Sequence, residues 1–248
     1  MTQQDETLLE CRDVSFRYPT GDWILQNVSL QIGRHERVGL VGPSGYGEPL
    51  KTMFLEVGVW GEAPHIALLL FTEKQKGRFL EMPYGKSTLS KLLAGYELPD
   101  KGEIRWKGKQ LPCRGYCPVQ MIYQHPEKAL DPRWRLKYSL CEGWNPDAAL
   151  LERLGIRTDL WLDRYPNELS GGELQRFCVA RVLGPQTECI IADEMSTMLD
   201  AITQAHIWNV LLEETERCEI GLIVITHHHC LAERLCTRII DLRELNGK

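Results

Sequence analysis

Two separated halves of a phosphate-binding loop constrain this chain more than any other feature. Residues 42–47, Gly-Pro-Ser-Gly-Tyr-Gly, supply the glycine half of the G-x-x-x-x-G-K-[ST] pattern, but Glu48 stands where lysine is required. The missing half lies at residues 84–88, Tyr-Gly-Lys-Ser-Thr. Removing residues 48–85 would restore an unbroken motif, so we expect the two halves to form one site.

The motif has a physical purpose. Glycines let the backbone curl so that successive N–H groups converge on phosphate oxygens, and the N-terminus of the following helix adds positive potential. Lys86 is expected to reach the β- and γ-phosphates, and Ser87 is expected to coordinate Mg²⁺. The candidate phosphate-binding residues are Gly42, Pro43, Ser44, Gly45, Tyr46, Gly47, Gly85, Lys86, Ser87 and Thr88.

Residues 48–85 are interpreted as an insertion within this loop. The Tyr-Gly pair repeats at both borders, which resembles a duplicated insertion boundary. A long structureless excursion inside a compact domain is uncommon, and Glu48 adds negative charge where phosphate must bind. A translated insertion, an error in the sequence or gene model, and an engineered insertion all stay open.

Composition excludes several classes of function. A chain of 248 residues with 43% hydrophobic content can bury the core of one domain, and its formal net charge of -5 disfavours direct nucleic-acid binding. The strongest apolar stretch, residues 66–71, is too short to cross a bilayer, and residues 1–7 resemble no signal peptide. We expect a cytoplasmic chain whose membrane association comes through a partner.

The nine cysteines are interpreted as reduced thiols. Cys113 and Cys117 form the closest pair, and residues 227–230 read His-His-His-Cys, but this arrangement lacks zinc-ligand spacing. We therefore favour the absence of a structural metal.

Strand and helix patterns alternate along the chain. Apolar alternation predicts strands over residues 8–16, 23–32, 37–41 and 118–123, a hairpin over 102–111, and buried strands over 189–194 and 222–227. The segment from about 126 to 168 is expected to be a helical subdomain, with its clearest helical periodicity at 147–154. The order is that of an α/β fold.

Two later motifs add chemistry to this frame. Residues 169–176, Leu-Ser-Gly-Gly-Glu-Leu-Gln-Arg, open a helix that Ser170 is placed to cap, which makes a second anion-binding helix end. The strand at 189–194 ends in Asp193 and Glu194, where a Mg²⁺ ligand and a water-activating base are expected. The next apolar strand ends at His227.

In this order the elements resemble the ATP-binding subunit of ABC transporters, over nearly the whole chain outside residues 48–85. The resemblance implies a P-loop NTPase fold of the ABC ATPase type, with a mixed sheet core, an antiparallel β subdomain and a helical subdomain. It makes residues 1–248 a single ABC ATP-binding domain that uses ATP and Mg²⁺. Residues 124–134 resemble the glutamine loop of the oligopeptide, dipeptide and nickel importers.

The resemblance assigns roles to five residues outside the phosphate loop. Tyr18 would stack on adenine, Gln124 would sense Mg²⁺ and the attacking water beside the transport channel, and Asp193 would hold Mg²⁺. Glu194 would polarise water, and His227 would contact the γ-phosphate. Taken alone, a tyrosine after a strand more often packs half-buried, and a lone histidine or glutamine more often sits in solvent.

Further residues imply a second subunit. Ser170, Gly171, Gly172 and Glu173 would bind ATP held mainly by the opposite subunit, and Asp200 would lie in the loop that crosses the interface. Either a homodimer or a heterodimer fits, since importers of this group often pair two different ATPase chains. Met195-Ser196 stand where the family usually has Pro-Thr, a variation we expect the loop to tolerate.

Two functions follow from these patterns. The first is an ATPase that drives uptake of peptides or nickel and other metal complexes through permease subunits at the inner face of the membrane. The second is a non-hydrolysing or inactivated subunit whose phosphate loop is disrupted by residues 48–85. The cargo is not specified by this sequence.

Overall fold

The computed structural model describes residues 7–19, 21–42, 85–197 and 199–245. The predictions for Pro43, Ser44, Gly45, Tyr46 and Gly47, and for the insertion up to residue 84, lie outside the described residues.

A three-stranded antiparallel sheet opens the chain. It consists of β1 (Thr7–Phe16), β2 (Leu25–Gly33) and β4 (Lys101–Trp106) in the order β2-β1-β4. The strands predicted near residues 8–16 and 23–32 are confirmed. The hairpin predicted over residues 102–111 is confirmed only at its turn: Lys107 and Gly108 are both left-handed, and a single antiparallel bridge joins Trp106 to Lys109. β4 pairs instead along β1.

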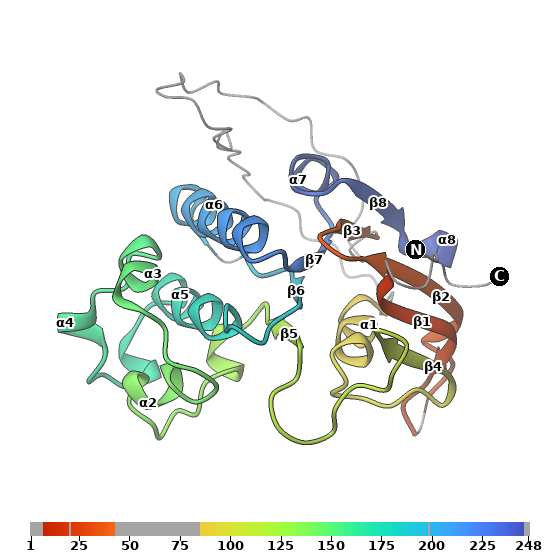
Figure 1. Ribbon diagram of the computed structural model, residues 1–248, viewed down its shortest axis with the longest axis horizontal. Coiled ribbons are helices and arrows are strands. Elements are labelled where there is room, and N and C mark those ends of the chain that lie inside the picture. The colour runs from red at the N-terminus through yellow and green to blue at the C-terminus, as the bar shows by residue number, and fades with distance from the viewer. Residues whose placement is uncertain (1–6, 20, 43–84, 198, 246–248) are drawn as a thin grey trace, which may run out of the picture.

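A five-stranded parallel sheet forms the centre of the molecule (Figure 1). Its order is β5-β6-β7-β3-β8, so the strand that enters the phosphate loop lies beside the last two strands. The strands are β3 (Arg37–Val41), β5 (Val119–Ile122), β6 (Cys189–Asp193), β7 (Gly221–Thr226) and β8 (Arg238–Asp241). The predicted strands at residues 37–41, 118–123, 189–194 and 222–227 are therefore confirmed within about one residue at each end.

Alternate residues of the central strands enter two different hydrophobic cores, as the two-residue period of a strand requires. On β6, Ile191 packs with β1, β2 and α1 (Lys86–Leu93), whereas Ile190 packs with the helices of the opposite face. Those helices are α5 (Gly171–Val182), α6 (Ala201–Arg217) and α7 (His229–Leu235). The sheet is thus covered on both faces, and this explains its nearly continuous apolar strands.

Between β5 and α5 the chain forms only short helices. They are a 3₁₀ turn at Pro126–Lys128, α2 (Leu136–Leu140), α3 (Ala148–Arg153), α4 (Thr158–Trp161) and a 3₁₀ turn at Pro166–Glu168. Asp147 caps α3 by accepting a hydrogen bond from the Leu150 N–H at 2.7 Å. Trp161 packs against Phe177 of α5, so this segment shares the helical core. A short helix, α8 (Leu242–Leu245), follows β8.

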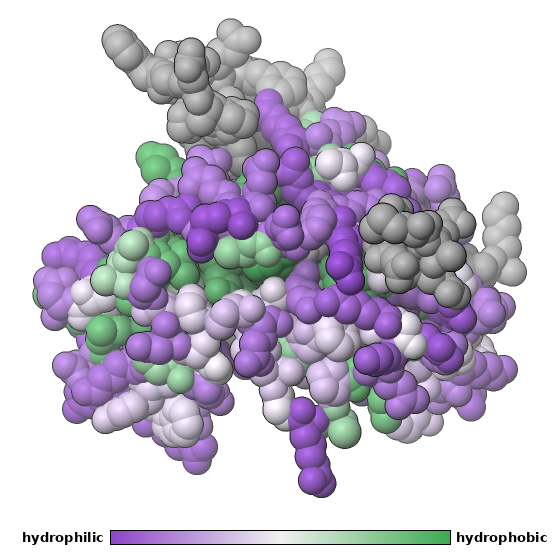
Figure 2. Space-filling model, in the orientation of Figure 1, coloured by the Kyte–Doolittle hydropathy of each residue, from purple (hydrophilic) through white to green (hydrophobic). Residues whose placement is uncertain are grey.

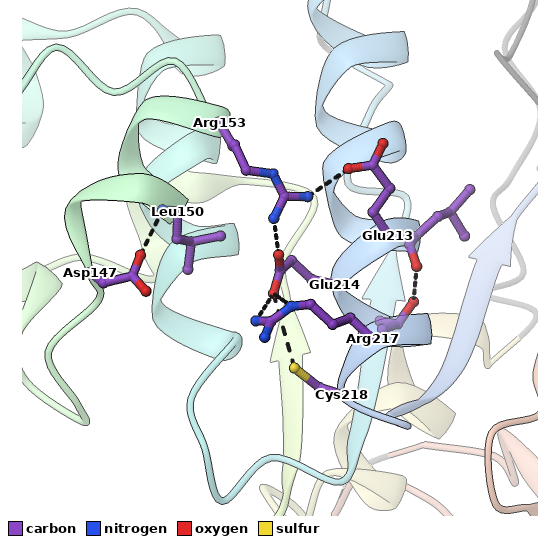
Figure 3. Close-up of polar contacts among 9 residues, drawn as sticks. Asp147, Leu150, Arg153, Glu213, Glu214, Arg217 and Cys218 are labelled. Atoms are coloured by element: carbon purple, nitrogen blue, oxygen red, sulfur yellow. Dashed lines mark hydrogen bonds and ion pairs between the residues drawn. The ribbon is translucent and has the colours of Figure 1, made fainter. Parts of the chain in front are cut away.

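An ionic cluster joins α3 to α6 (Figure 3). The Glu214 side chain is buried, yet its carboxylate is an acceptor for both Arg153 of α3 and Arg217 of its own helix. Arg153 also donates to the exposed Glu213 at 2.6 Å. Burial acts to raise the pKa of Glu214, but the hydrogen bonds from Arg217 and Arg153 outweigh it and hold that pKa below its ordinary value. This cluster, Arg153–Glu214–Arg217, therefore ties the helical segment to the central domain.

The visible surface is mainly hydrophilic, with hydrophobic side chains showing between α5 and α6 (Figure 2). Across the described ranges, none of the helices has the length and apolar character that crossing a bilayer requires.

Candidate functional site

The two ends of the split phosphate loop meet in the structure. Gly42 directly follows β3, and Lys86 begins α1, 44 positions later in the chain. The Lys86 ammonium lies 3.4 Å from the Gly42 carbonyl oxygen, and a Cβ built on Gly42 would lie 3.8 Å from the Lys86 Cδ. Gly42, which begins the glycine half, and Lys86 of the other half are therefore in contact.

Gly85 joins the phosphate loop to helix α1 in a backbone conformation that favours glycine. Its φ is 70°, in the left-handed region, and it caps α1. A Cβ at this position would lie 2.6 Å from the Leu25 Cδ2, so both backbone and packing require glycine. Ser87 and Thr88 follow in the first turn, with Ser87 exposed and Thr88 buried.

Three candidate residues follow neighbouring parallel strands. Asp193 ends β6 opposite Ile225 of β7, Glu194 comes next, and His227 follows β7. Since the carboxyl ends of parallel strands share one edge of a sheet, these side chains converge where α1 begins. Burial of every β6 residue fixes the two carboxylates at this edge.

Glu194 lies between two cationic or ionisable partners. Its Oε1 accepts a hydrogen bond from the Lys86 ammonium at 2.9 Å and lies 3.2 Å from the His227 Nδ1, which is not aligned for a hydrogen bond. Burial alone would raise the pKa of Glu194, but His227 and Lys86 lower it to about 2. Glu194 is therefore an anion at neutral pH.

Asp193 is the most enclosed carboxyl group of the site. It is 4% exposed, and burial raises its pKa to about 6, against the opposing effect of the Ser87 hydroxyl. Its Oδ1 is buried without a hydrogen-bond partner among the described residues. A buried orphan carboxylate oxygen beside a serine hydroxyl is the hard-oxygen set that Mg²⁺ prefers, so the residues fit this cation.

Gln124 is connected to Glu194 through hydrogen bonds made by Thr197. It follows β5 and donates from Nε2 to the Thr197 Oγ1 at 3.3 Å, while Thr197 donates from the same hydroxyl to the Glu194 carbonyl oxygen at 3.1 Å. The sequence predicts Gln124 but misses Thr197. A hydroxyl residue three positions after Glu194 is the available signal, because serine and threonine close short turns of this kind.

His228 packs directly on His227, with ring centroids 3.8 Å apart. Burial and the neighbouring His227 lower its pKa to about 4, so it is neutral at physiological pH. The sequence does not predict His228 as a site residue, although a run of three histidines after a buried strand marks the position.

The second predicted anion site forms a capped helix start. Ser170 and Glu173 exchange hydrogen bonds in a capping box at the beginning of α5, with the Ser170 N–H 2.7 Å from a Glu173 oxygen. Gly171 is exposed, and a Cβ there would meet nothing within 4 Å. Gly172 lies against the start of α6, where a Cβ would lie 3.4 Å from the Thr203 Cγ2.

Asp200 caps α6 at this same place. Its carboxylate accepts from the backbone N–H groups of Ile202 and Thr203 at 3.1 and 3.0 Å. The structure thus brings Asp200 beside the start of α5. Within the described chain, no hydrogen bond or ion pair links this α5–α6 corner to Lys86, Asp193 or Glu194.

Tyr18 lies apart from these groups at the end of β1. Its ring packs edge-on against Phe16 with centroids 5.1 Å apart, and the residue is 39% exposed.

No metal-binding cluster of three or more His, Cys, Asp or Glu side chains occurs in the described part of the chain, and Cys113 and Cys117 are free thiols.

Comparison with known proteins shows the family to which this chain is similar. The ABC transporter family model matches residues 82–197. A nickel import ATP-binding protein, NikE of Rhodospirillum rubrum, is 33% identical over 232 residues, covering 85% of this chain and 78% of that protein. The glutathione import ATP-binding protein GsiA of Salmonella choleraesuis is 30% identical, covering 95% of this chain and 36% of that protein.

A solved structure supports the fold. The dimeric ATP-binding cassette MJ0796, in a post-hydrolysis state with ADP and phosphate bound, superposes with a TM-score of 0.67. The match covers 94% of each chain at 20% identity, and at that identity it speaks for the fold alone. The sequence relatives above show that this chain belongs to the ATP-binding proteins of the ABC transporter family.

Proposed function

We propose that this chain is the ATP-hydrolysing subunit of an ABC importer. The observation that carries the proposal is the convergence of Lys86, Asp193, Glu194 and His227 at one sheet edge, beside Gly42. These groups suit phosphoryl transfer to water, which needs cationic stabilisation of phosphate and a base that orients the attacking water.

Each residue of the site has a proposed task. The first turn of α1, with Gly85, Lys86, Ser87 and Thr88, holds the phosphates, and Lys86 neutralises their charge. Glu194 is ionised, since its pKa of about 2 keeps it an anion, and its carboxylate is proposed to accept a hydrogen bond from the attacking water and orient it. His227 contacts the transferred phosphate, and Gln124 is linked to the site by its hydrogen bond to Thr197.

Mg²⁺ is proposed to bind at Asp193, with Ser87 and Gln124 as further oxygen ligands. The orphaned, buried Asp193 Oδ1 supports this choice. When bound, Mg²⁺ neutralises phosphate charge and fixes the phosphate orientation.

Tyr18, an exposed aromatic residue that precedes the phosphate loop in the chain, is proposed to stack on adenine.

A second ATPase subunit is proposed to complete the site. Ser170, Gly171, Gly172 and Glu173 lie at an exposed helix start, which is suited to a phosphate on another molecule. Asp200 lies beside them, at the corner that would cross the interface. Either a homodimer or a heterodimer is compatible with this arrangement, and the dimeric state of the cassette MJ0796 supports such pairing.

Permease subunits are the proposed membrane partners, and they would hold this chain at the cytoplasmic face of the membrane. A groove of about 590 Å³ is a candidate docking site for these subunits. The first residue of its lining, Lys128, lies four positions after Gln124 in the chain. It is lined by residues 128–134 together with Glu142 and Arg181, and it includes the exposed Trp134.

We propose residues 126–168 as a helical subdomain within a single domain, and residues 48–85 as an insertion.

The cargo is proposed to be a peptide or a nickel or other metal complex. The names of NikE and GsiA, nickel import and glutathione import, support this class. We propose that the permease partners rather than this subunit select among such cargoes.

A second candidate is a non-hydrolysing subunit that keeps the fold and the partner contacts. The separation of residues 42–47 from residues 85–88 favours it, because the chain leaves the site where consecutive N–H groups should face phosphate. Phosphate release from ATP by the purified chain, compared with Glu194→Gln, separates the two. Hydrolysis lost in that variant supports the ATPase, whereas equal background rates support the non-hydrolysing subunit.

A further inference from the structure

The backbone of Glu194 is held in a conformation that residues with side chains rarely adopt. Its φ is 45°, in the left-handed region, where the Cβ of a non-glycine residue crowds the backbone. Such strain persists only where the surroundings fix it, and it concentrates at functional sites. What fixes Glu194 therefore decides where its carboxylate points.

Hydrogen bonds hold the two sides of this residue. On one side, the Glu194 N–H donates to the Ile225 carbonyl oxygen of β7 at 2.9 Å. On the other, the Glu194 carbonyl oxygen accepts twice from Thr197, from its N–H at 3.2 Å and from its hydroxyl at 3.1 Å. The backbone N–H bond alone makes a turn, and the hydroxyl bond adds a second constraint that depends on the side chain.

The Thr197 hydroxyl also faces the next strand of the sheet. Its oxygen accepts from the Gln124 Nε2 at 3.3 Å while its proton goes to the Glu194 carbonyl, so one hydroxyl uses both of its bonding capacities. Gln124 is in turn adjacent to Tyr123, whose carbonyl oxygen accepts from the buried Gln175 Nε2 of α5 at 3.4 Å. Three hydrogen bonds and the peptide link between Tyr123 and Gln124 thus connect α5 to Glu194.

We propose that Thr197 is a positioning residue: its hydroxyl holds the strained Glu194 backbone and links it to Gln124, so that the Glu194 carboxylate is aimed at its water. This inference rests on the proposed ATPase function for its kinetic consequence, but not for its structural one. In this role Thr197 acts through Glu194, whose carbonyl oxygen accepts from its hydroxyl.

The test compares Thr197→Val with Thr197→Ser in the full-length chain. Valine keeps the branched shape and removes the hydroxyl, whereas serine keeps the hydroxyl. Thr197 is exposed, so both variants are expected to fold with an unchanged Tm. For ATP hydrolysis, valine is expected to lower kcat about 10-fold to 100-fold with little change in KM, and serine to restore kcat, because a misaimed base loses rate rather than binding.

A second measurement tests the positioning role without ATP hydrolysis. Hydrogen exchange of the Glu194 amide, measured by NMR without nucleotide, is expected to be about tenfold faster with valine and unchanged with serine, because the bond to Ile225 opens more often. Exchange that follows the hydroxyl in a chain that hydrolyses no ATP would retain the positioning role and reject the proposed function. Wild-type kcat and exchange in Thr197→Val would overturn the positioning role itself.

Discussion

The ammonium group of Lys86 lies 2.9 Å from the Glu194 Oε1, although 108 positions separate the two residues. One belongs to the first turn of α1, and the other follows β6. The side chains are only 13% and 15% exposed, so the pair is largely shielded from solvent. The cation proposed to bind phosphate and the base proposed to activate water are therefore in contact, and each variant below changes one of them or its surroundings.

Replacing Lys86 should remove most nucleotide binding. Lys86→Ala deletes the cation next to Gly42 and Glu194, and we expect ATP affinity to fall at least about 10-fold, because one charge-assisted contact to phosphate is lost. Isothermal titration with MgATP measures the change. Lys91→Ala, in the last turn of the same helix, is the matched control and should bind like wild type. Equal affinity in Lys86→Ala would place the phosphates elsewhere.

Replacing Glu194 should separate binding from hydrolysis. Glu194→Gln keeps the shape of the side chain but removes the anion that pairs with Lys86, so Lys86 becomes available to phosphate. We expect ATP affinity equal to or above that of wild type and hydrolysis at least about 100-fold slower, as for the loss of a general base. Steady-state phosphate release and equilibrium titration on one preparation measure both. Parallel losses of binding and rate would show that Glu194 serves mainly to shape the site.

Gly171 tests the proposed second subunit. A Cβ at this position meets nothing within 4 Å, so Gly171→Ala should leave the Tm of the isolated chain within a few degrees of wild type. A partner's phosphate that approaches the helix start would meet the new methyl group. In the Glu194→Gln background with ATP, we therefore expect dimer formation, measured by analytical ultracentrifugation, to weaken at least about 10-fold. A dimer unaffected by Gly171→Ala would move the interface away from α5.

The sequence predicts the β-strands well because their burial is plain in the residue pattern. Every residue of β6 and β7 is buried, and runs such as residues 222–225 have few alternatives to a central strand. The hairpin at residues 102–111 forms only its turn, with one bridge from Trp106 to Lys109, and the long pairing of β4 is with β1, about 90 positions earlier. Periodicity carries no information about such pairing. Local pattern therefore gives the elements, and long-range contacts decide their neighbours.

The candidate site follows the same division. Motif spacing indicates Lys86, Asp193 and Glu194, because each ends a strand or begins a helix. The left-handed backbone of Glu194 and its bond to Thr197 depend on how β6 and β7 meet, which no local pattern reports. His227 is predicted only through the family resemblance, and the structure places it 3.2 Å from Glu194.

The ionic cluster Arg153–Glu214–Arg217 should give a pH-dependent stability. Glu214→Gln removes a buried charge that two guanidinium groups share, and we expect a loss of about 1–3 kcal/mol in the free energy of unfolding at neutral pH. The wild-type pKa is lowered, so this stabilisation is complete above the ordinary value of 4.5 and is lost as pH falls through the lowered value. Urea unfolding of both proteins between pH 7 and about pH 3 follows the difference.

Glu213→Gln is the matched control for that cluster. Glu213 pairs with the same Arg153 but is 66% exposed, so its loss should cost well under about 1 kcal/mol. A difference between wild type and Glu214→Gln that stays constant down to low pH would show that the carboxylate is not stabilised by the arginines.

The most direct test of the account is MgATP binding by the full-length chain, measured beside a variant that lacks residues 48–85. Gly42 and Lys86 already lie together in the full-length protein, so we expect both to bind ATP with affinities within about 10-fold of each other, and Lys86→Ala to weaken binding in both. Binding by the shortened variant alone would contradict the account, because it would mean that the meeting of Gly42 and Lys86 does not make a working phosphate site.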